Sequence, residues 1–416
     1  MKNPNLHGRT LYIPQMNYAG SRALAAAFRC VGVDAVVSPD SDEKTIELGA
    51  RYTSGDECYP QRITLGDFLK VTEATGFRPE KTAFYMPTSS GPCRFGQYAG
   101  YIRKVMAELG YEDVIVLSPS CVNSYEEITK YGGIELLRTA WWAIVGSDLL
   151  ERMLLKTRPC EVTKGDADAA FEKSVDMLCD VIEKPNKIRK RFTAITDALT
   201  ESRDVFRRIP VRYNPESLLI GIVGEIFCRL NSFSNDELIR KVEDLDGRVW
   251  LSNTTEWLWY ANYVQQKDLQ DTRKRFSKAM LFAEFRTLFQ RIDERSLLRP
   301  FVSDLQEYEE PSDIREIMAK SDPYIPHSNI LGEMILSLGK AIYLYEKGAD
   351  GVVDISPFTC MNGNVAEAIY PHVSCACNGM PIRIFYFDGI QANMDRDVEI
   401  FMELARSYKQ KKRGNP

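Results

Sequence analysis

Long apolar runs are absent from this sequence. A run such as 218–222 has the length of a strand, whereas a membrane helix needs about 18 to 20 consecutive apolar residues. The first ten residues are polar and lack the apolar stretch of a secretory signal. We therefore expect a soluble cytoplasmic protein that does not associate with membranes and, in a reducing compartment, forms no disulfides.

A strong basic charge and the common nucleotide-binding motifs are also missing. The 53 Lys and Arg residues face 58 Asp and Glu residues, giving a net charge of −5, and the one basic cluster we single out is 409–413. Nucleic-acid surfaces need clustered Lys and Arg, so we expect no nucleic-acid partner. Neither a G-x-G-x-x-G motif after a strand nor a P-loop lysine occurs, and only three histidines are present.

The 416 residues suffice for two to three domains, and a composition of 44% hydrophobic and 27% charged residues is typical of globular proteins. Short β-branched runs alternate with amphipathic helical stretches, which predicts an α/β fold with parallel strands. We expect strands at 10–14, 35–38, 82–86, 114–118, 218–223, 248–252, 351–355 and 382–387. We expect helices at 21–30, 61–75, 98–109, 169–182, 186–202 and 395–409, and another opening near 234–237.

This order of elements predicts three regions. We expect an N-terminal α/β domain at 1–145, a helical connector at 146–214 and a C-terminal α/β domain with a helical insertion at 215–416. The two strand-rich halves suggest two similar domains that face each other. No close sequence repeat supports duplication.

Four cysteines share an unusual context, because each lies in a loop rich in Pro, Gly or Ser. They are Cys58, Cys93, Cys121 and Cys360, and the last three directly follow an expected strand. In open α/β sheets the carboxyl ends of the strands form the ligand-binding crevice. Helices are expected to begin after Cys58, Cys93 and Cys360, so their N-termini would favour thiolates and an anionic cluster.

The remaining cysteines divide by context. Cys30 and Cys179 lie in apolar periodic segments and are assigned to helix packing, while Cys160 is expected to be incidental. Cys228 lies just beyond a strand, where packing and ligation are both open. Cys375 and Cys377 form a C-x-C pair, a short metal-binding signal.

Zinc is the competing metal. Structural zinc sites draw on close cysteine pairs, but the four loop cysteines are 35, 28 and 239 positions apart, so an iron–sulfur cluster in a cleft between domains fits better. Glu225 and Arg229 flank a strand end, where they either face this cleft or form a structural salt bridge.

On these residues the chain resembles the 2-hydroxyacyl-CoA dehydratase and benzoyl-CoA reductase superfamily, in its branch of activase-associated domains and double-cubane cluster proteins. The resemblance covers most of the chain. It is carried by 55–60, 91–98, 224–229 with Asn231 and Asn235, 348–363 and 381–389.

The resemblance implies two Rossmann-like domains with an iron–sulfur cluster in the cleft between them. By motif position, Cys58, Cys93 and Cys360 look like the ligands of a 4Fe-4S cluster. Cys121, Cys375 and Cys377 would complete the six thiolates of an 8Fe-9S double cubane, and the choice between one and two cubanes stays open. The resemblance also implies an ATP-dependent activase that carries its own 4Fe-4S cluster, and it is compatible with a homodimer.

The functional expectation is therefore an iron–sulfur reductase or 2-hydroxyacyl-CoA dehydratase-like oxidoreductase. It would accept low-potential electrons from the activase and act on a small molecule or an acyl-CoA, and anaerobically purified protein would be brown. Two alternatives remain. One is a non-catalytic iron–sulfur electron-transfer or assembly module, and the other is a metal-free two-domain ligand binder whose cysteines serve only packing.

Overall fold

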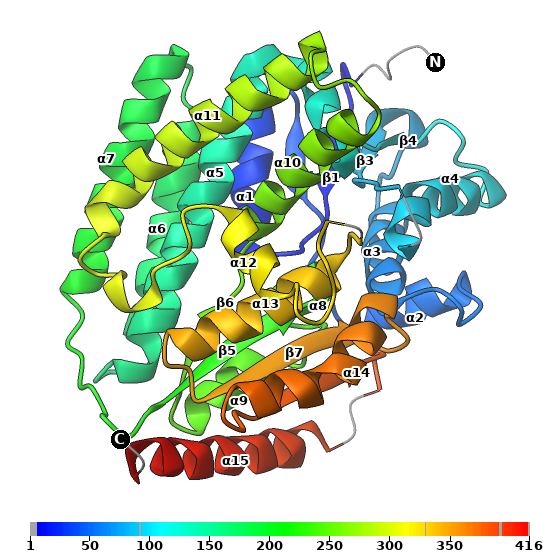
Figure 1. Cartoon of the computed structure of the whole chain (residues 1–416). Coiled ribbons are helices and arrows are strands. Elements are labelled where there is room, and N and C mark those ends of the chain that lie inside the picture. The colour runs from blue at the N-terminus through cyan, green and yellow to red at the C-terminus, as the bar shows by residue number, and fades with distance from the viewer. Residues whose placement is uncertain (1–5, 91–92, 329, 391–392, 415–416) are drawn as a thin grey trace.

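A computed structural model describes residues 6–90, 93–328, 330–390 and 393–414 (Figure 1). Within them the chain forms two four-stranded sheets, each with all neighbouring strands parallel. The expected α/β architecture with two Rossmann-like sheets is confirmed. Among the described residues, no helix is both long enough and apolar enough to cross a membrane.

The two sheets have the same strand order, β2-β1-β3-β4 and β6-β5-β7-β8. All eight expected strands are confirmed, with ends shifted by a residue or two. The strands of the N-terminal sheet are β1 (Thr10–Ile13), β2 (Ala35–Val37), β3 (Thr82–Tyr85) and β4 (Ile115–Leu117). Those of the C-terminal sheet are β5 (Leu218–Gly224), β6 (Gly247–Leu251), β7 (Gly351–Pro357) and β8 (Ile382–Phe387).

Helices cover both sheets and form a separate layer beside them (Figure 1). Those of the first half are α1 (Tyr18–Arg29), α2 (Glu43–Arg51), α3 (Tyr59–Thr72), α4 (Tyr98–Glu108), α5 (Thr129–Thr157), α6 (Asp166–Glu183) and α7 (Ile188–Arg207). Those of the second half are α8 (Ile226–Leu230), α9 (Leu238–Asp244), α10 (Thr254–Asp271), α11 (Lys278–Leu298), α12 (Ile314–Lys320), α13 (Glu333–Glu346), α14 (Met361–Ala376) and α15 (Met394–Gly414). Two short 3₁₀ helices matter below, η2 (Arg94–Gln97) and η3 (Cys121–Asn123).

Helix α2 was not expected from the sequence. It has only 9 residues, so few apolar positions repeat along it, but its start is well defined. Asp42 accepts a hydrogen bond from the backbone N–H of Thr45, and the Thr45 hydroxyl accepts one from the backbone N–H of Asp42. This reciprocal cap stabilises a helix whose periodicity alone is weak.

The expected boundary at residue 145 falls inside α5. This helix runs for 29 residues and bends at Gly132 and Gly133, where Gly133 has a φ of 64°. Its buried side joins α1, α6 and α7 in one apolar core that includes Phe28, Trp142 and Leu199. Residues of the region 146–214 therefore share an apolar core with α1 of the N-terminal half.

The insertion between β6 and β7 fastens the two halves together. Thr255, in the first turn of α10, donates its backbone N–H to the buried carboxylate of Asp148 on α5 at 2.7 Å. On α11, Asp293 accepts hydrogen bonds from Trp142 at 2.7 Å and from Arg138 at 2.8 Å. Buried, charge-assisted bonds of this kind fix the position of the insertion against α5.

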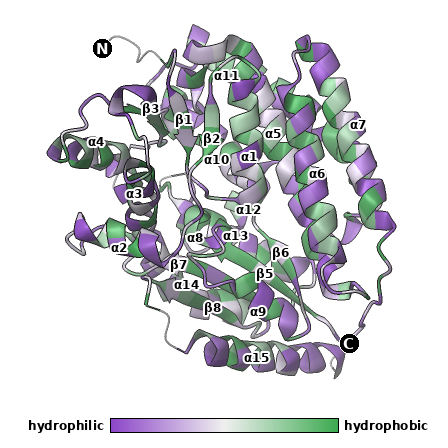
Figure 2. Ribbon diagram, turned by 180° about the vertical axis from the view of Figure 1, so that it is seen from behind, coloured by the Kyte–Doolittle hydropathy of each residue, from purple (hydrophilic) through white to green (hydrophobic). Residues whose placement is uncertain are grey.

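Helix α3 makes the second connection between the halves. Its residues Tyr59 and Ile63 lie in the same apolar core as Phe227 of α8 and Phe387 of β8. Beside it, the side-chain amide of Asn231 donates to the carbonyl oxygen of Gln15 at 2.7 Å. Seen from behind, apolar segments line the sheets on the inside of both halves (Figure 2). The two halves thus meet over the loops that carry the cysteines.

Candidate metal centre

Three of the expected ligands occupy equivalent backbone positions. Cys58, Cys93 and Cys360 each immediately precede a helix, α3, η2 and α14 respectively, and have extended φ/ψ of −72°/154°, −65°/130° and −64°/124°. None of their side chains caps its helix. Burial raises the pKa of each of these thiols, while a backbone N–H of the following turn, that of Gln61, Phe95 or Gly363, lowers it. The partial positive charge of these N–H groups favours thiolate and anionic groups.

Arg94 joins the loops of these three cysteines. It follows Cys93 directly and donates from Nη1 to the carbonyl oxygen of Asp56 at 2.6 Å, two residues before Cys58. Its Nη2 donates to the carbonyl oxygen of Thr359 at 2.7 Å and to the Thr359 hydroxyl at 3.1 Å, one residue before Cys360. One guanidinium thus connects all three loops across the boundary between the two sheets.

Two further contacts hold these loops. The Tyr98 hydroxyl, in the first turn of α4, is hydrogen-bonded to the sulfur of Cys58. Thr359 has a φ of 61°, which places a β-branched residue in the left-handed region. Such strained backbone persists only where its surroundings hold it, and it is common at functional sites. The chain keeps this strained geometry at the residue directly before Cys360.

Cys121 lies next to the Cys93 loop. The backbone N–H of Cys121 donates to the carbonyl oxygen of Thr88 at 2.8 Å, and the Thr88 hydroxyl donates to the carbonyl oxygen of Gly96 at 3.0 Å. The loops after β3 and β4 are therefore tied together, as expected for neighbouring strand ends. Burial raises the pKa of the Cys121 thiol to about 11, and the nearby Cys93 adds to this.

Cys228, whose role the sequence left open, lies near Cys58 and Cys360. It lies in α8, directly after β5, and is completely buried. Burial raises the pKa of its thiol, and the charges of Glu225, Cys58 and Cys360 raise it further. Its place after a strand was the available sequence signal, but the apolar residues around it resembled an ordinary core segment.

Two buried carboxyl groups of the C-terminal half belong to the same centre. Glu225 precedes α8 and accepts backbone hydrogen bonds from Phe227 at 3.1 Å and Cys228 at 2.8 Å. Glu333, at the start of α13, accepts one from Ile226 at 3.0 Å. Burial raises the pKa of both, and the negative charge of Glu225 raises that of Glu333 further, so the pair favours a protonated form.

The expected alternatives for Glu225 and Arg229 are resolved by these contacts. The guanidinium of Arg229 lies near Glu333, with Nη1 and Oε1 3.9 Å apart, while Glu225 caps α8. Among the described residues, Arg229 Nη2 and both polar side-chain atoms of Gln61 are buried without a hydrogen-bond partner. Gln61 lies one helical turn after Cys58. These atoms are among seventeen such atoms spread over the described residues, so the missing partners do not by themselves single out this place.

Cys375 and Cys377 lie at the opposite end of α14 from Cys360. Cys360 precedes the 16-residue helix α14 and Cys377 follows it. At 1.5 Å per residue, α14 separates the two by about 24 Å. Cys377 is buried in the apolar core with Val373 and Met380. The length of α14 thus sets Cys377 apart from Cys360, and the six-thiolate set of a double cubane stays a prediction.

The arrangement differs from a site for one metal ion. Among the residues described, no three or more His, Cys, Asp or Glu side chains are grouped so as to hold a single ion. In a cubane each thiolate binds a different iron, so the sulfurs surround a volume and need not converge on a point. Thiol donors from two sheets and helix N-termini fit such a group.

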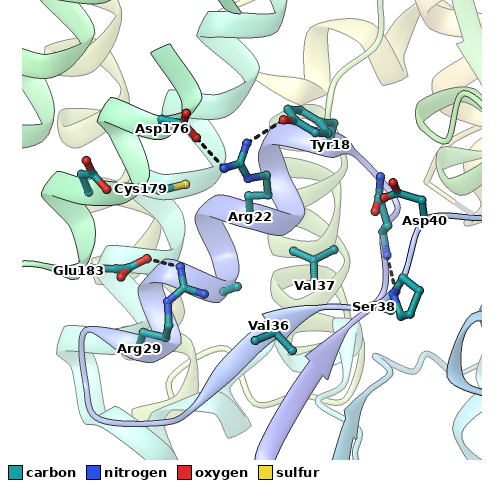
Figure 3. Close-up of a pocket in the computed structure, with 14 residues that line it drawn as sticks. Tyr18, Arg22, Arg29, Val36, Val37, Ser38, Asp40, Asp176, Cys179 and Glu183 are labelled. Carbon is teal, nitrogen blue, oxygen red and sulfur yellow. Dashed lines mark hydrogen bonds and ion pairs between the residues drawn. The ribbon is translucent and has the colours of Figure 1, made fainter. Parts of the chain in front are cut away.

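Neither of the two surface hollows described next identifies the position of the candidate metal centre. One hollow of about 670 Å³ lies between α1, β2 and α6 and is lined by two ion-paired arginines, Arg22 with Asp176 and Arg29 with Glu183 (Figure 3). A smaller one of about 140 Å³ is lined by Tyr59, the residue after Cys58, and by the end of β8. It is the one of these two that touches the boundary between the halves.

Comparison with known proteins adds no assignment. No protein-family model and no curated protein matches this chain. The superfamily resemblance therefore continues to rest on the short motifs of the sequence, and the contacts described above are the basis for proposing a function.

Proposed function

We propose that this chain is an iron–sulfur reductase or dehydratase-like enzyme that holds a 4Fe-4S cluster between its two halves. Cys58, Cys93 and Cys360 would ligate the cluster. The observation that carries the proposal is the guanidinium of Arg94, which ties together the loops of all three cysteines from both halves. Three separate packing cysteines would not require a common connection of this kind.

A cluster held there would supply one-electron chemistry at low potential. The chain's own groups would support it in distinct ways. The three helix N-termini would lower the cost of holding negative charge, and the Tyr98 hydroxyl would donate to the Cys58 sulfur once that sulfur is a thiolate ligand. Glu333 has one oxygen, Oε1, bonded to the Ile226 N–H, so its proton would be held at Oε2 and be available to a reacting group.

We also propose an electron donor and a substrate for this centre. An ATP-dependent activase with its own cluster would deliver the electrons, and a small molecule or an acyl-CoA would be reduced or dehydrated. A cytoplasmic, oxygen-poor setting suits such a centre. Cys121 and Cys228 border the three ligands and would pack against the cluster.

The proposal is tested by counting iron and acid-labile sulfide in anaerobically purified or reconstituted protein. We expect a brown protein with about four irons per chain, and a large loss of both in Cys58→Ser. Cys179→Ser is the matched control, because Cys179 is a buried cysteine of α6 in a different core. A colourless protein after reconstitution, or equal iron in both variants, would exclude the proposed centre.

The small hollow beside Tyr59 favours a second candidate, a cluster protein that passes electrons on without binding a large substrate. Reduction by an activase followed by transfer to a second protein, with no turnover of acyl-CoA compounds, would support it. Consumption of an acyl-CoA that depends on the activase would support the enzyme instead.

A further inference from the structure

Helix α11 carries a large apolar surface that the proposed centre does not use. Its six outward side chains are each between 39 and 55% exposed, and they are Leu281, Phe282, Phe285, Leu288, Phe289 and Ile292. At typical side-chain areas this amounts to roughly 500 Å². Soluble proteins rarely expose a continuous apolar patch of this size unless it binds something. We call these six residues the α11 ridge.

The ridge is rigidly presented. The opposite side of α11 is fixed to the protein by the buried residues Met280, Ala283 and Leu297, and by Arg286, which bonds Glu126 at 2.9 Å. The helix lies across the outside of the helical layer, over α5 (Figure 1). Its apolar side chains are therefore exposed by the fold and not by fraying of the helix.

The spacing of the ridge indicates what fits it. A Leu-Phe pair recurs after seven residues, at 281–282 and 288–289, and is followed each time three residues later by Phe285 or Ile292. A seven-residue apolar repeat on one face of a helix is the pattern that packs against a second helix. The apolar part, 281–292, is about 17 Å long, or three turns.

Basic residues occupy the next positions of the seven-residue repeat at both ends of the α11 ridge. Lys278 stands seven residues before Phe285, and Arg299 stands seven after Ile292. The loop before α11 adds Arg273, Lys274 and Arg275, while the nearest preceding acidic residue, Asp271, is already paired with Lys267 at 2.8 Å. The ridge is thus apolar in its middle and positively charged at its ends, in a protein whose net charge is negative.

These end charges argue against a second copy of the chain. Two α11 helices packed in parallel would bring Lys278 against Lys278 and Arg299 against Arg299, and antiparallel packing would bring Lys278 against Arg299. Like charges meet in both cases, which costs binding energy. We propose that the ridge binds an amphipathic helix of a partner protein that carries acidic residues at both ends of its apolar face.

A synthetic helical peptide tests this proposal directly. The probe has about three heptads, with Leu at the seam positions and Glu at both ends, and its control carries Lys in place of Glu. Fluorescence anisotropy with the full chain should show the Glu peptide binding on the order of tenfold tighter or better, and weakening as salt increases. Equal binding of the two peptides, or binding of neither, would overturn the proposal.

Variants of the chain test whether the peptide binds at the ridge or at another surface. Phe285→Glu with Leu288→Glu should abolish binding, whereas Val162→Glu, a similar change at a residue 59% exposed outside the ridge, should leave it intact. Reversing the charge at both ends of the ridge with Lys278→Glu and Arg299→Glu should make the chain prefer the Lys peptide. Both ends are exposed, so this variant should keep the fold, which circular dichroism checks. Unchanged preference would count against the proposal.

Other occupants of the ridge give different results. Flotation with vesicles of phosphatidylcholine and phosphatidylserine, lost in the Phe285 and Leu288 variant while the Glu peptide does not bind, would assign the ridge to lipid. A concentration-dependent dimer in sedimentation, lost in the same variant, would assign it to a second copy. Either result would overturn the partner-helix proposal.

Discussion

The two sheets have the same topology but bring different chemistry to the centre. By strand order β3 corresponds to β7, and the loops that follow them carry Cys93 and Cys360 at the same position before a helix. Otherwise the halves differ. The N-terminal half adds the thiols of Cys58 and Cys121, while the C-terminal half adds the thiol of Cys228 and the buried carboxyls of Glu225 and Glu333.

The two halves show that sheet topology fixes where a site lies but does not fix which chemical groups occupy it. Parallel strands end at one edge of a sheet, so any side chain placed there is available to a shared ligand. In the proposed centre the thiols would supply soft ligands, and the carboxyls would supply protons. The division suggests that the N-terminal half mainly holds the proposed cluster and the C-terminal half mainly serves proton transfer.

The largest expected effect concerns the corresponding pair of cysteines. If Cys93 and Cys360 are equivalent ligands, Cys93→Ser and Cys360→Ser should each lose more than about half of the bound iron, and to a similar extent. Anaerobic iron and sulfide analysis measures this. A loss confined to one of the two variants would show that the halves do not share a cluster.

The next effect tests a buried carboxyl on the N-terminal side. Asp67 of α3 accepts hydrogen bonds from Ser41 at 2.8 Å and Thr45 at 2.7 Å, yet burial raises its pKa from 3.8 to about 7. Between these values the folded protein binds more protons than the unfolded chain. Wild-type stability should therefore fall as pH rises from about 4 to 7 and then level off.

Asp67→Asn removes this proton uptake, so it should gain stability relative to the wild type from pH 4 to pH 8. The gain should reach on the order of 2–4 kcal/mol. Urea unfolding of both proteins across this pH range measures it. Parallel pH profiles would contradict the raised pKa of Asp67.

A smaller effect is expected for the connection between the halves. Arg94→Ala removes the hydrogen bonds to the loops of Cys58 and Cys360 and should cost about 1–2 kcal/mol, because these charge-assisted bonds are partly exposed. Iron retention after reconstitution should fall as well. Arg94→Lys is the matched control, since it keeps the charge but cannot span both loops with a planar fork. Iron retention equal to wild type in Arg94→Ala would remove the main support for the proposed centre.

The smallest effect separates the two ends of α14. Cys377→Ser should leave the iron content unchanged and should lower stability by about 1 kcal/mol, because it places a hydroxyl in the apolar core. Iron analysis and thermal unfolding check both statements. Loss of iron in this variant would restore the C-x-C pair as a ligand and contradict its separation from Cys360 by α14.

Much of the fold was predictable from local pattern. Every expected strand formed, because β-branched runs bounded by Gly, Pro and Ser have one favoured conformation. The long helix α5 was not expected from the sequence, and the expected boundary at 145 falls inside it. Its packing against α1, α6 and α7 in one core depends on the tertiary structure.

The candidate metal centre, too, could be predicted only in part from the sequence. Cys93, Cys121 and Cys360 were recognisable because they follow strands, whereas Arg94 and Glu333 carry no local signal. Glu333 begins α13, which is far from Glu225 in the sequence and becomes its neighbour only through folding. Cys375 and Cys377 had a motif but lie at the far end of a helix.

The sequence by itself determined which segments become strands and helices, and which cysteines stand at strand ends, because these depend on residues only a few positions apart. Only the tertiary structure decided which of those cysteines face one another, since that depends on how two sheets 200 residues apart pack across α3 and on where Arg94 reaches. Sequence spacing does not measure distance in space, and the length of α14 is enough to set two cysteines apart from Cys360.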